Sequence, residues 1–405
     1  MKKLASLSLF AALVTSPGAQ AQTFSVIHTF SGIEGDHPQG VTLRAGTLYG
    51  TAGNGYGGVV YQLTPEGSGW LFTSIFPFLY RRNGIGPTNL VFGPDGLLYG
   101  TAQAGGVNIL GRCYYCGDGV VFELTPRSMI CKTANCFWQE NVFHTFTGAP
   151  GDGNEPVGDL AWDRQGNIYG TTVQGGTADL GTLFQLNLQT DSYSVIHHFL
   201  GYPDGDTPRN GVVVDTSGNL FGTTSGGGPL NSGSVFELTY VPEIGWTETF
   251  LHSFDGCDEF PYAGLTMDSS GNLYGATVVG CAGGGTIFEL SPSGDTWTYK
   301  VLYSIPGPGQ EYTGPYASLT MDAAGNLYGS TGGAGAYKQG NVFKLSNTPN
   351  GWVYTSLHDF TGGSDGGNPF YQVAIDTDGT LYGTTNEGGG GNCGFGCGVV
   401  WMIKP

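Results

Sequence analysis

NLYGAT (272–277) is the clearest copy of a motif that recurs along the whole chain. Each copy places an aliphatic residue before a Tyr-Gly or Phe-Gly pair, and the copies follow one another at intervals of 50 to 70 residues. The seven pairs begin at Tyr49, Tyr99, Tyr169, Phe221, Tyr274, Tyr328 and Tyr382. This self-similarity predicts that one supersecondary unit is built seven times.

Each motif has the same three companions. In the fifth copy GLTMD (264–268) precedes the motif, TIFELS (286–291) follows it, and the aromatic-rich WTETFLHSF (246–254) stands ahead of both. These short segments are bounded by Gly, Asp, Asn or Pro, which is typical of strands, and we name them A (GLTMD), B (NLYGAT), C (TIFELS) and D (ending in LHSF). Four strands per repeat are the signature of a propeller blade. We therefore predict an all-β, seven-bladed β-propeller, four strands per blade, as a single domain of residues 22–405.

The two ends of this domain complement each other. Phe24 to Phe30 (FSVIHTF) is a D segment with no A, B or C before it, while Val399 to Ile403 (VVWMI) is a C segment with no D after it. Pairing the two would complete the seventh blade and remove the free sheet edges that an open array leaves exposed. We predict that the ring closes in this way.

Composition narrows the class of protein. Among 405 residues there are 73 glycines, 13% aromatic and only 11% charged residues, a balance that excludes a disordered chain or a coiled coil. The formal net charge of −18 repels phosphate backbones, so we expect no nucleic-acid partner.

Residues 1–21 have the features of a secretory signal peptide. Lys2 and Lys3 precede the apolar stretch Leu4 to Val14, and Ala19-Gln20-Ala21 forms a small-residue cleavage site. No later stretch is apolar for long enough to span a membrane. We expect an exported monomer, either secreted or periplasmic.

The tandem units LYGTT (381–385), VFELT (235–239) and the glycine pairs between such segments resemble the GloVer (Gloeo/Verruco) tandem-repeat exported proteins of environmental bacteria. The resemblance covers nearly all of the chain after residue 21. It implies a β-propeller and export, and it implies no particular biochemical activity.

The chain has eight cysteines, all after residue 21, and an even number in an exported protein favours disulfides. The spacing Cys113-x2-Cys116 and Cys131-x4-Cys136 is also that of a four-thiolate zinc site. However, the first pair falls in a B-to-C loop and the second in a C-to-D turn, which lie on opposite faces of a propeller. We therefore predict the pairs Cys113–Cys116, Cys131–Cys136, Cys257–Cys281 and Cys393–Cys397.

Because adjacent strands of a blade are antiparallel, the D-to-A and B-to-C connections share one face, which we call the loop face. Variable loops on a rigid scaffold are the usual place for binding sites. Acidic residues recur in the D-to-A loops, and Asp36, Asp152, Asp206 and Asp365 are candidate Ca²⁺ ligands. The alternative, which we favour, is a repeated turn in which Asp caps backbone donors. No other metal or cofactor is expected.

Five of the seven histidines occupy one repeat position, two residues before the aromatic residue of strand D: His28, His144, His197, His252 and His358. Ser74 and Tyr303 stand there in the other two copies by the same alignment. A residue that most blades share is better explained by packing than by catalysis, so we interpret this position as structural.

Residues that break the repeat are better functional candidates. On the loop face these are the basic residues Arg81, Arg82, Arg209 and Lys338, the histidine His37, and the tyrosines Tyr80, Tyr202, Tyr262, Tyr316 and Tyr371. Together they would bind sugar carboxylates through bidentate arginine and stack sugar rings on tyrosine. The alternative is a set of solvated surface positions.

The favoured function is therefore a non-catalytic binding or scaffold module for a carbohydrate or another extracellular polymer. One alternative is a polysaccharide-active enzyme, a lyase or hydrolase, in which His37 removes a proton while Arg81, Arg82 or Arg209 neutralises the neighbouring carboxylate. A protein–protein interaction scaffold is the other alternative.

Overall fold

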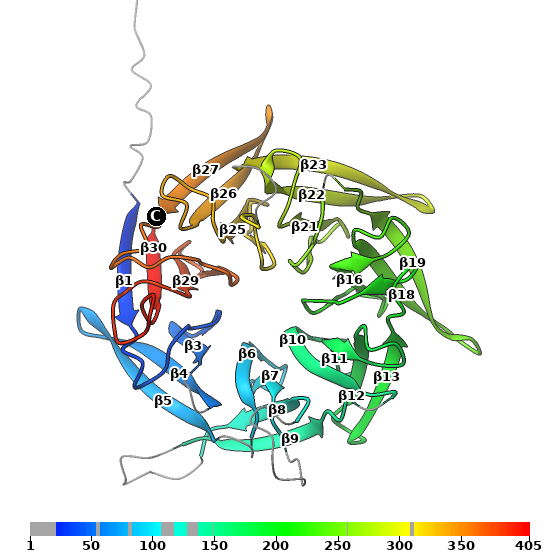
Figure 1. Ribbon diagram of the computed structural model, residues 1–405, viewed down its shortest axis with the longest axis horizontal. Coiled ribbons are helices and arrows are strands. Elements are labelled where there is room, and N and C mark those ends of the chain that lie inside the picture. Colours follow the sequence, from blue (N-terminus) through cyan, green and yellow to red (C-terminus); the bar gives the residue numbers. More distant parts are fainter. Residues whose placement is uncertain are drawn as a thin grey trace, which may run out of the picture.

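Seven four-stranded antiparallel sheets stand around a central axis, as Figure 1 shows. The structure is a computed structural model, which describes residues 22–53, 57–79, 83–106, 117–127, 137–148, 150–256, 258–307 and 312–405. Every regular element within these ranges is a β-strand. The prediction of an all-β, seven-bladed propeller is thus confirmed. In the described ranges no helix is long and apolar enough to cross a membrane.

The strands of each blade follow the predicted order from the axis outwards. Blade 1 consists of β2 (Val41–Arg44), β3 (Thr47–Ala52), β4 (Gly57–Glu66) and β5 (Gly69–Leu79). Blade 2 consists of β6 (Ile85–Phe92), β7 (Leu98–Ala104), β8 (Val120–Thr125) and β9 (Gln139–Thr145). Blade 3 consists of β10 (Gly153–Trp162), β11 (Asn167–Gly175), β12 (Thr182–Asn187) and β13 (Ser192–His198).

The inner strands of the remaining blades are shorter. Blade 4 consists of β15 (Val213–Val214), β16 (Leu220–Thr224), β18 (Ser234–Val241) and β19 (Gly245–Ser253). Blade 5 consists of β20 (Thr266–Met267), β21 (Leu273–Thr277), β22 (Gly283–Ser293) and β23 (Thr296–Pro306). Blade 6 consists of β24 (Thr320–Met321), β25 (Leu327–Thr331), β26 (Asn341–Thr348) and β27 (Gly351–Asp359).

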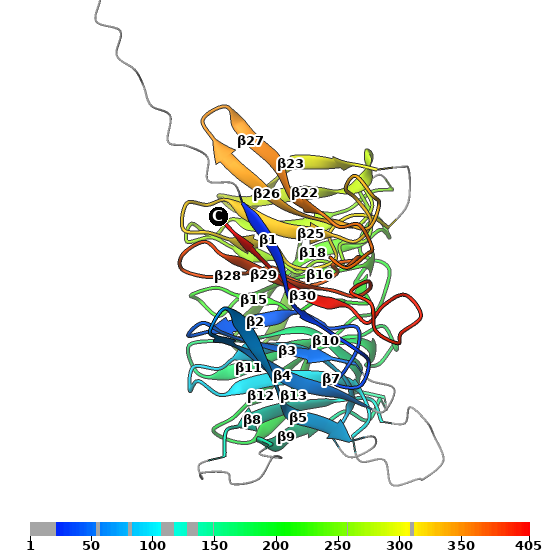
Figure 2. The same ribbon diagram turned by 90° about the vertical axis from the view of Figure 1, so that its left-hand side faces the viewer.

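Blade 7 is built from both ends of the domain. Its inner strands are β28 (Ala374–Ile375), β29 (Leu381–Thr385) and β30 (Val399–Lys404), and its outer strand is β1 (Thr23–Thr29). The register runs from Thr23 opposite Lys404 to Thr29 opposite Val399. Figure 2 shows β1 lying beside β30. The predicted closure of the ring is confirmed.

The B motif explains why each blade folds in the same way. In blade 3 Ile168 is fully buried, and the Tyr169 hydroxyl donates a hydrogen bond of 3.0 Å to Asp163 in the preceding turn. Gly170 lies opposite Phe184, and a Cβ on this glycine would come within 2.4 Å of the Phe184 ring. The glycine is required because the aromatic ring of strand C packs across it.

The hydrophobic core is divided among the junctions between blades. At one junction Phe221 and Val235 of blade 4 pack against Leu265, Leu273 and Phe288 of blade 5. Equivalent clusters occur at the other junctions, including the one that joins blade 7 to blade 1. Each blade is therefore stabilised by both neighbours, which is why the closed ring matters for the whole fold.

Short strand pairs extend the sheets onto the loop face. β14 (Gly205–Asp206) pairs with β17 (Gly226–Gly227), and Asp36 bridges to Gly53 in blade 1. A D-to-A loop thus lies beside a B-to-C loop, as expected.

One predicted disulfide, Cys393–Cys397, is present in the B-to-C loop of blade 7. Cys281 is also disulfide-bonded. Its predicted partner Cys257 lies outside the described residues. The same applies to Cys113, Cys116, Cys131 and Cys136, so these pairings stay predictions.

Candidate functional site

The loop face holds a pocket of about 270 Å³ at the mouth of the central channel. Each blade has a proline either at the end of its D-to-A loop or among the first residues of its inner strand, and the residue after that proline lines the pocket in all seven blades. These seven residues are Gln39, Thr88, Val157, Arg209, Tyr262, Tyr316 and Phe370. The pocket thus exists only because all blades converge on the axis.

Close packing fixes the position of each proline. In blade 4, Pro208 lies against Gly181 of blade 3, where a Cβ would come within 2.6 Å of the proline ring. Gly340 and Pro369 repeat this contact between blades 6 and 7, with 2.4 Å for the same distance. The residue that follows each proline therefore lies at the same level along the channel axis.

Hydroxyl groups of the B motif hold the next residues of the wall. Thr171 donates a hydrogen bond of 2.8 Å to the carbonyl oxygen of Asn210 in the next blade. Ser330 donates one of 3.0 Å to the carbonyl oxygen of Tyr371 in the same way. The repeated motif therefore anchors the backbone on which the variable side chains stand.

The wall of the pocket has one aromatic half. The rings of Tyr262 and Tyr316 are 5.8 Å apart, and the rings of Tyr316 and Phe370 are 4.8 Å apart. The guanidinium carbon of Arg209 lies 4.8 Å from the centre of the Tyr262 ring. Arg209 makes no ion pair with any described residue. Blades 4 to 7 thus present a continuous arc of one cation and three rings.

The opposite half of the pocket is mostly polar. Gln39, Asn89 and Gln103 bring amide groups to it from blades 1 and 2. Asn89 also accepts a hydrogen bond of 3.2 Å from the backbone N–H of Gly40. An amide offers both donors and acceptors, so this half is suited to hydroxyl groups.

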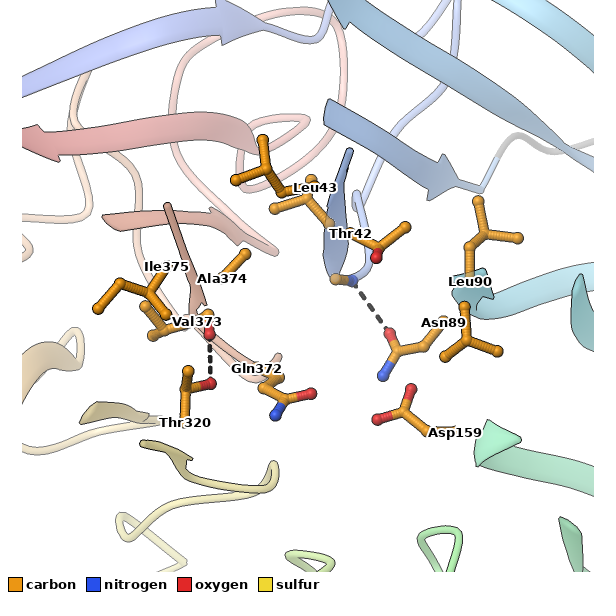
Figure 3. A pocket seen from close by; sticks show the side chains of 13 residues that line it. Thr42, Leu43, Asn89, Leu90, Asp159, Thr320, Gln372, Val373, Ala374 and Ile375 are labelled. Carbon is orange, nitrogen blue, oxygen red and sulfur yellow. Dashed lines mark hydrogen bonds between the residues drawn. The ribbon is translucent and has the colours of Figure 1, made fainter. Parts of the chain in front are cut away.

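Below the mouth, the channel continues as a second cavity of about 270 Å³, which Asn89 also lines. Figure 3 shows the side chains of Asn89, Asp159 and Gln372 directed towards the same space. Burial raises the pKa of Asp159, and a hydrogen bond with Asn89 offsets part of this effect. Asn89, Asp159 and Gln372 thus bring polar groups to the channel below the mouth.

The tyrosines of the mouth stay protonated at neutral pH. Burial raises the pKa of Tyr316 to about 12 and that of Tyr371 to about 12. Burial likewise raises the pKa of Tyr262, although the charge of Arg209 lowers it in part. A phenolate that would act as a base is therefore disfavoured, and the Tyr316 hydroxyl donates a hydrogen bond of 3.0 Å to the carbonyl oxygen of Tyr312.

The structure brings together four predicted site residues, namely Arg209, Tyr262, Tyr316 and Tyr371. Three others lie in separate loops outside the pocket. The side chain of His37 is 46% exposed and lies 3.1 Å from Asp36, Tyr202 is 71% exposed, and Lys338 is exposed in the β25–β26 loop. Tyr80, Arg81 and Arg82 lie outside the described residues.

Sequence reasoning missed Gln39, Thr88, Val157 and Phe370, because these residues share no chemistry. The signal that finds them is positional, since each follows the proline that recurs between strands D and A or early in strand A of every blade.

Two of the candidate Ca²⁺ ligands have partners within their own loops. Asp152 accepts backbone hydrogen bonds from Thr147 and Gly153, of 2.9 Å and 2.8 Å. Although burial raises the pKa of Asp152, hydrogen bonds from His144, Tyr193 and the backbone outweigh it, and the pKa is lowered. Asp365 accepts a bond of 3.0 Å from the Thr361 N–H. The other two candidates are Asp36 and Asp206, and the four residues belong to the D-to-A connections of four different blades.

The repeated histidines pack between the outer strands of neighbouring blades. His144 of blade 2 stacks on Tyr193 of blade 3, with ring centres 3.5 Å apart, and His252 stacks on Tyr299 at 3.8 Å. A similar stack joins His358 to Phe24 at 3.7 Å. These contacts agree with a structural role.

The alignment of Ser74 with these histidines is wrong. Phe76 pairs with Val60 of strand C, just as His252 pairs with Val235, whereas Ser74 pairs with Tyr61. The same β-bulge occurs at this point of strand D in blade 4, so the two blades align only when Phe76 is matched to His252. Phe76 is therefore the blade 1 residue at the histidine position.

The sequence matches the model of the Gloeobacter/Verrucomicrobia repeat over residues 115–307 and 245–396. No curated protein matches the sequence. Among solved structures, an ancestral GH74 enzyme is 13% identical, with a TM-score of 0.55, over 92% of this chain and 48% of that chain. A glucose dehydrogenase is 14% identical, with a TM-score of 0.46, over 95% and 99% of the two chains.

The aldose sugar dehydrogenase of Streptomyces coelicolor is 11% identical, with a TM-score of 0.48, over 96% of this chain and 99% of that chain. At such low identity these likenesses concern the fold alone.

Proposed function

Since the chain belongs to the Gloeobacter/Verrucomicrobia repeat family, whose β-propeller it builds, we propose that it is an exported carbohydrate-binding protein. The ligand occupies the mouth of the central channel on the loop face. Export is supported by the signal-like residues 1–21 and by the Cys393–Cys397 disulfide.

The observation that carries the proposal is the two-sided wall of the mouth. Tyr262, Tyr316 and Phe370 offer ring faces on one side, while Gln39 and other amide side chains face them. Sugars present apolar C–H faces and a rim of hydroxyl groups, so they need both kinds of surface at once. Pockets for small ligands usually measure about 300–1,000 Å³. At about 270 Å³ the cavity lies just below this range, so it would hold no more than a short saccharide or the end of a longer one.

Arg209 makes an acidic sugar the preferred ligand. Its guanidinium lies over Tyr262 at the edge of the aromatic arc and has no carboxylate partner among the residues that the structure describes. Arginine binds a carboxylate through two parallel hydrogen bonds. The net charge of −18 repels a long polyanion, so a short uronic-acid oligosaccharide is favoured over a polymer.

Calorimetric titration tests this proposal with galacturonic- and glucuronic-acid oligosaccharides and with neutral oligosaccharides of the same length. The purified protein should bind the acidic sugars. Arg209→Gln should weaken that binding by roughly 10-fold or more, because a hydrogen bond to a charged group contributes about 1.5–3 kcal/mol. Tyr316→Ala should weaken binding of every sugar by removing a stacking face.

Tyr337→Ala is the matched control, since Tyr337 lies on the same face, is 60% exposed and does not line the pocket. It should bind like the unmodified protein. Absence of binding to all oligosaccharides would overturn the proposal. The appearance of unsaturated products, followed by their ultraviolet absorbance, would replace it with the lyase alternative.

A further inference from the structure

His197, Asp204 and Glu248 form a cluster at the rim, between the outer strands of blades 3 and 4. His197 Nε2 lies 3.6 Å from Asp204 Oδ1 and 3.9 Å from Glu248 Oε1. The three atoms all lie within 4.8 Å of one another. Figure 1 shows β13, which carries His197, and β19, which carries Glu248, as outer strands of neighbouring sheets. Asp204 comes from the loop between β13 and β14.

These atoms are buried but unsatisfied. His197 Nε2, Asp204 Oδ1 and Glu248 Oε1 are inaccessible to solvent, and none has a hydrogen-bond partner among the described residues. Buried polar atoms are nearly always paired, because leaving one unpaired costs about 1–3 kcal/mol. One bound ligand would satisfy all three atoms, because they lie within 4.8 Å of one another.

The junction of blades 3 and 4 lacks hydrogen-bond donors that another junction of the ring has. At the junction of blades 2 and 3, the loop carboxylate of Asp152 accepts hydrogen bonds from the hydroxyls of Tyr193, at 2.6 Å, and Thr147, at 3.1 Å. The residue equivalent to Thr147 is Leu200, and the residue equivalent to Tyr193 is Glu248. Two neutral hydroxyl donors have thus been replaced by an alkyl group and a second acid.

The result is two carboxyl groups and one imidazole around one point. Asp204 keeps a single bond to its loop, from the Leu200 N–H to Oδ2 at 2.8 Å, which leaves Oδ1 free. The ligand atoms of all three side chains lie within 4.8 Å of one another, so a single cation placed between them would contact each one.

We propose that His197, Asp204 and Glu248 bind a divalent transition-metal ion, with Zn²⁺ as the ion that fits best. Imidazole and carboxylate are Zn²⁺ ligands, whereas Ca²⁺ and Mg²⁺ prefer oxygen alone. Ligands about 2.1 Å from a tetrahedral ion lie about 3.4 Å apart, close to the separations of 3.6 and 3.9 Å seen here. The ion joins two blades and a loop, and it leaves one coordination position for a ligand from outside the cluster.

Titration of the purified, chelator-treated protein with Zn²⁺ tests the site, with calorimetry and thermal unfolding as readouts. We expect one strong site per chain and a Tm that rises by a few degrees when Zn²⁺ is in large excess over Kd. Glu248→Gln should weaken Zn²⁺ binding by roughly 100-fold or more and abolish the rise in Tm.

Glu248→Tyr restores the residue found at the equivalent position of blade 3, so it should fold and should also fail to bind Zn²⁺. The matched control is Glu140→Gln, at the same position of blade 2 but outside the cluster, which should keep the Zn²⁺ response. The proposal is overturned if Zn²⁺ leaves the Tm of the unmodified protein unchanged. It is also overturned if Glu248→Gln and Glu248→Tyr bind Zn²⁺ as tightly as the unmodified protein.

Discussion

Tyr61 is the residue at which strand C of blade 1 departs from the other blades, which carry Phe or Trp at the same place. It is fully buried, and its hydroxyl has no hydrogen-bond partner among the described residues. Since an unpaired buried hydroxyl costs about 1–3 kcal/mol, Tyr61→Phe should increase the free energy of unfolding by about 1 kcal/mol. The midpoint of urea unfolding measures this change.

The reverse substitution is the control for Tyr61→Phe. Phe288 occupies the same position in blade 5 and is equally buried, so Phe288→Tyr should lower the midpoint. If Tyr61→Phe instead lowered the midpoint of urea unfolding, the Tyr61 hydroxyl would have to form a hydrogen bond in the folded protein.

Glu140 makes the stability depend on pH. Burial raises its pKa to about 7, against an ordinary value of 4.5, and a hydrogen bond from Asn83 offsets only part of this effect. A raised pKa means that the folded state binds the proton more tightly than the unfolded state. The associated stability is therefore complete below pH 4.5 and is lost as the pH rises through about 7.

Glu140→Gln removes the buried charge and keeps an acceptor for Asn83. At pH 8 it should increase the free energy of unfolding by about 1–2 kcal/mol, a value reduced because the Glu140 side chain as a whole is only partly buried. Near pH 5 the stability difference between Glu140→Gln and the unmodified protein should be much smaller than at pH 8. Thermal unfolding of both proteins at each pH measures this difference. An equal difference at pH 5 and pH 8 would contradict the raised pKa of Glu140.

At the scale of the strand, the glycine of the B motif is required by the aromatic residue opposite it. A Cβ on Gly275 would lie 2.4 Å from the Phe288 ring, which is itself fully buried. Gly275→Ala should therefore lower the free energy of unfolding by about 1–3 kcal/mol, the usual cost of overpacking a core. The control is Gly69→Ala, whose Cβ would meet its nearest atom only at 3.9 Å. It should change stability by less than about 0.5 kcal/mol.

The strands were predictable because the B motif marks every blade in the same way. The register of strand D in blade 1 could not be predicted, because both Ser74 and Phe76 stand two residues before an aromatic residue. Only the pairing of Phe76 with Val60 decides between them. Because aromatic residues stand at both Phe76 and Phe78, the sequence alone cannot tell which of them matches the aromatic residue after each histidine.

The candidate site was predictable to the extent that its residues break the repeat with distinctive chemistry. Arg209 and the three tyrosines of the mouth stood out in this way, whereas Val157 and Thr88 did not. His37 and Tyr202 share the loop face but not the channel, because the path of each loop decides which of its residues reaches the axis. The His197–Asp204–Glu248 cluster depends on three segments meeting, which no single repeat shows.

At the scale of the whole molecule, the pocket and the closed ring depend on the same contact. The mouth takes one wall residue from every blade, so any opening of the ring between β1 and β30 would separate Gln39 from Phe370. Phe30, directly after β1, is fully buried in the core between blades 7 and 1. Deleting residues 22–30 should therefore expose the edge of β30, cause aggregation and abolish carbohydrate binding.

Moving the same residues instead of deleting them should preserve the protein. Thr23 lies opposite Lys404, so a linker of about four residues can join Pro405 to Gln22 as an ordinary hairpin between strands C and D. A permuted chain that starts at Ser31 and ends at Phe30 should unfold within about 5 °C of the chain of residues 22–405 and bind the same sugars, because its contacts are unchanged. Calorimetric scans of the deletion and the permutant make the comparison. If the permutant failed to fold while the deletion folded normally, the β1–β30 pairing would have no role in holding the ring together.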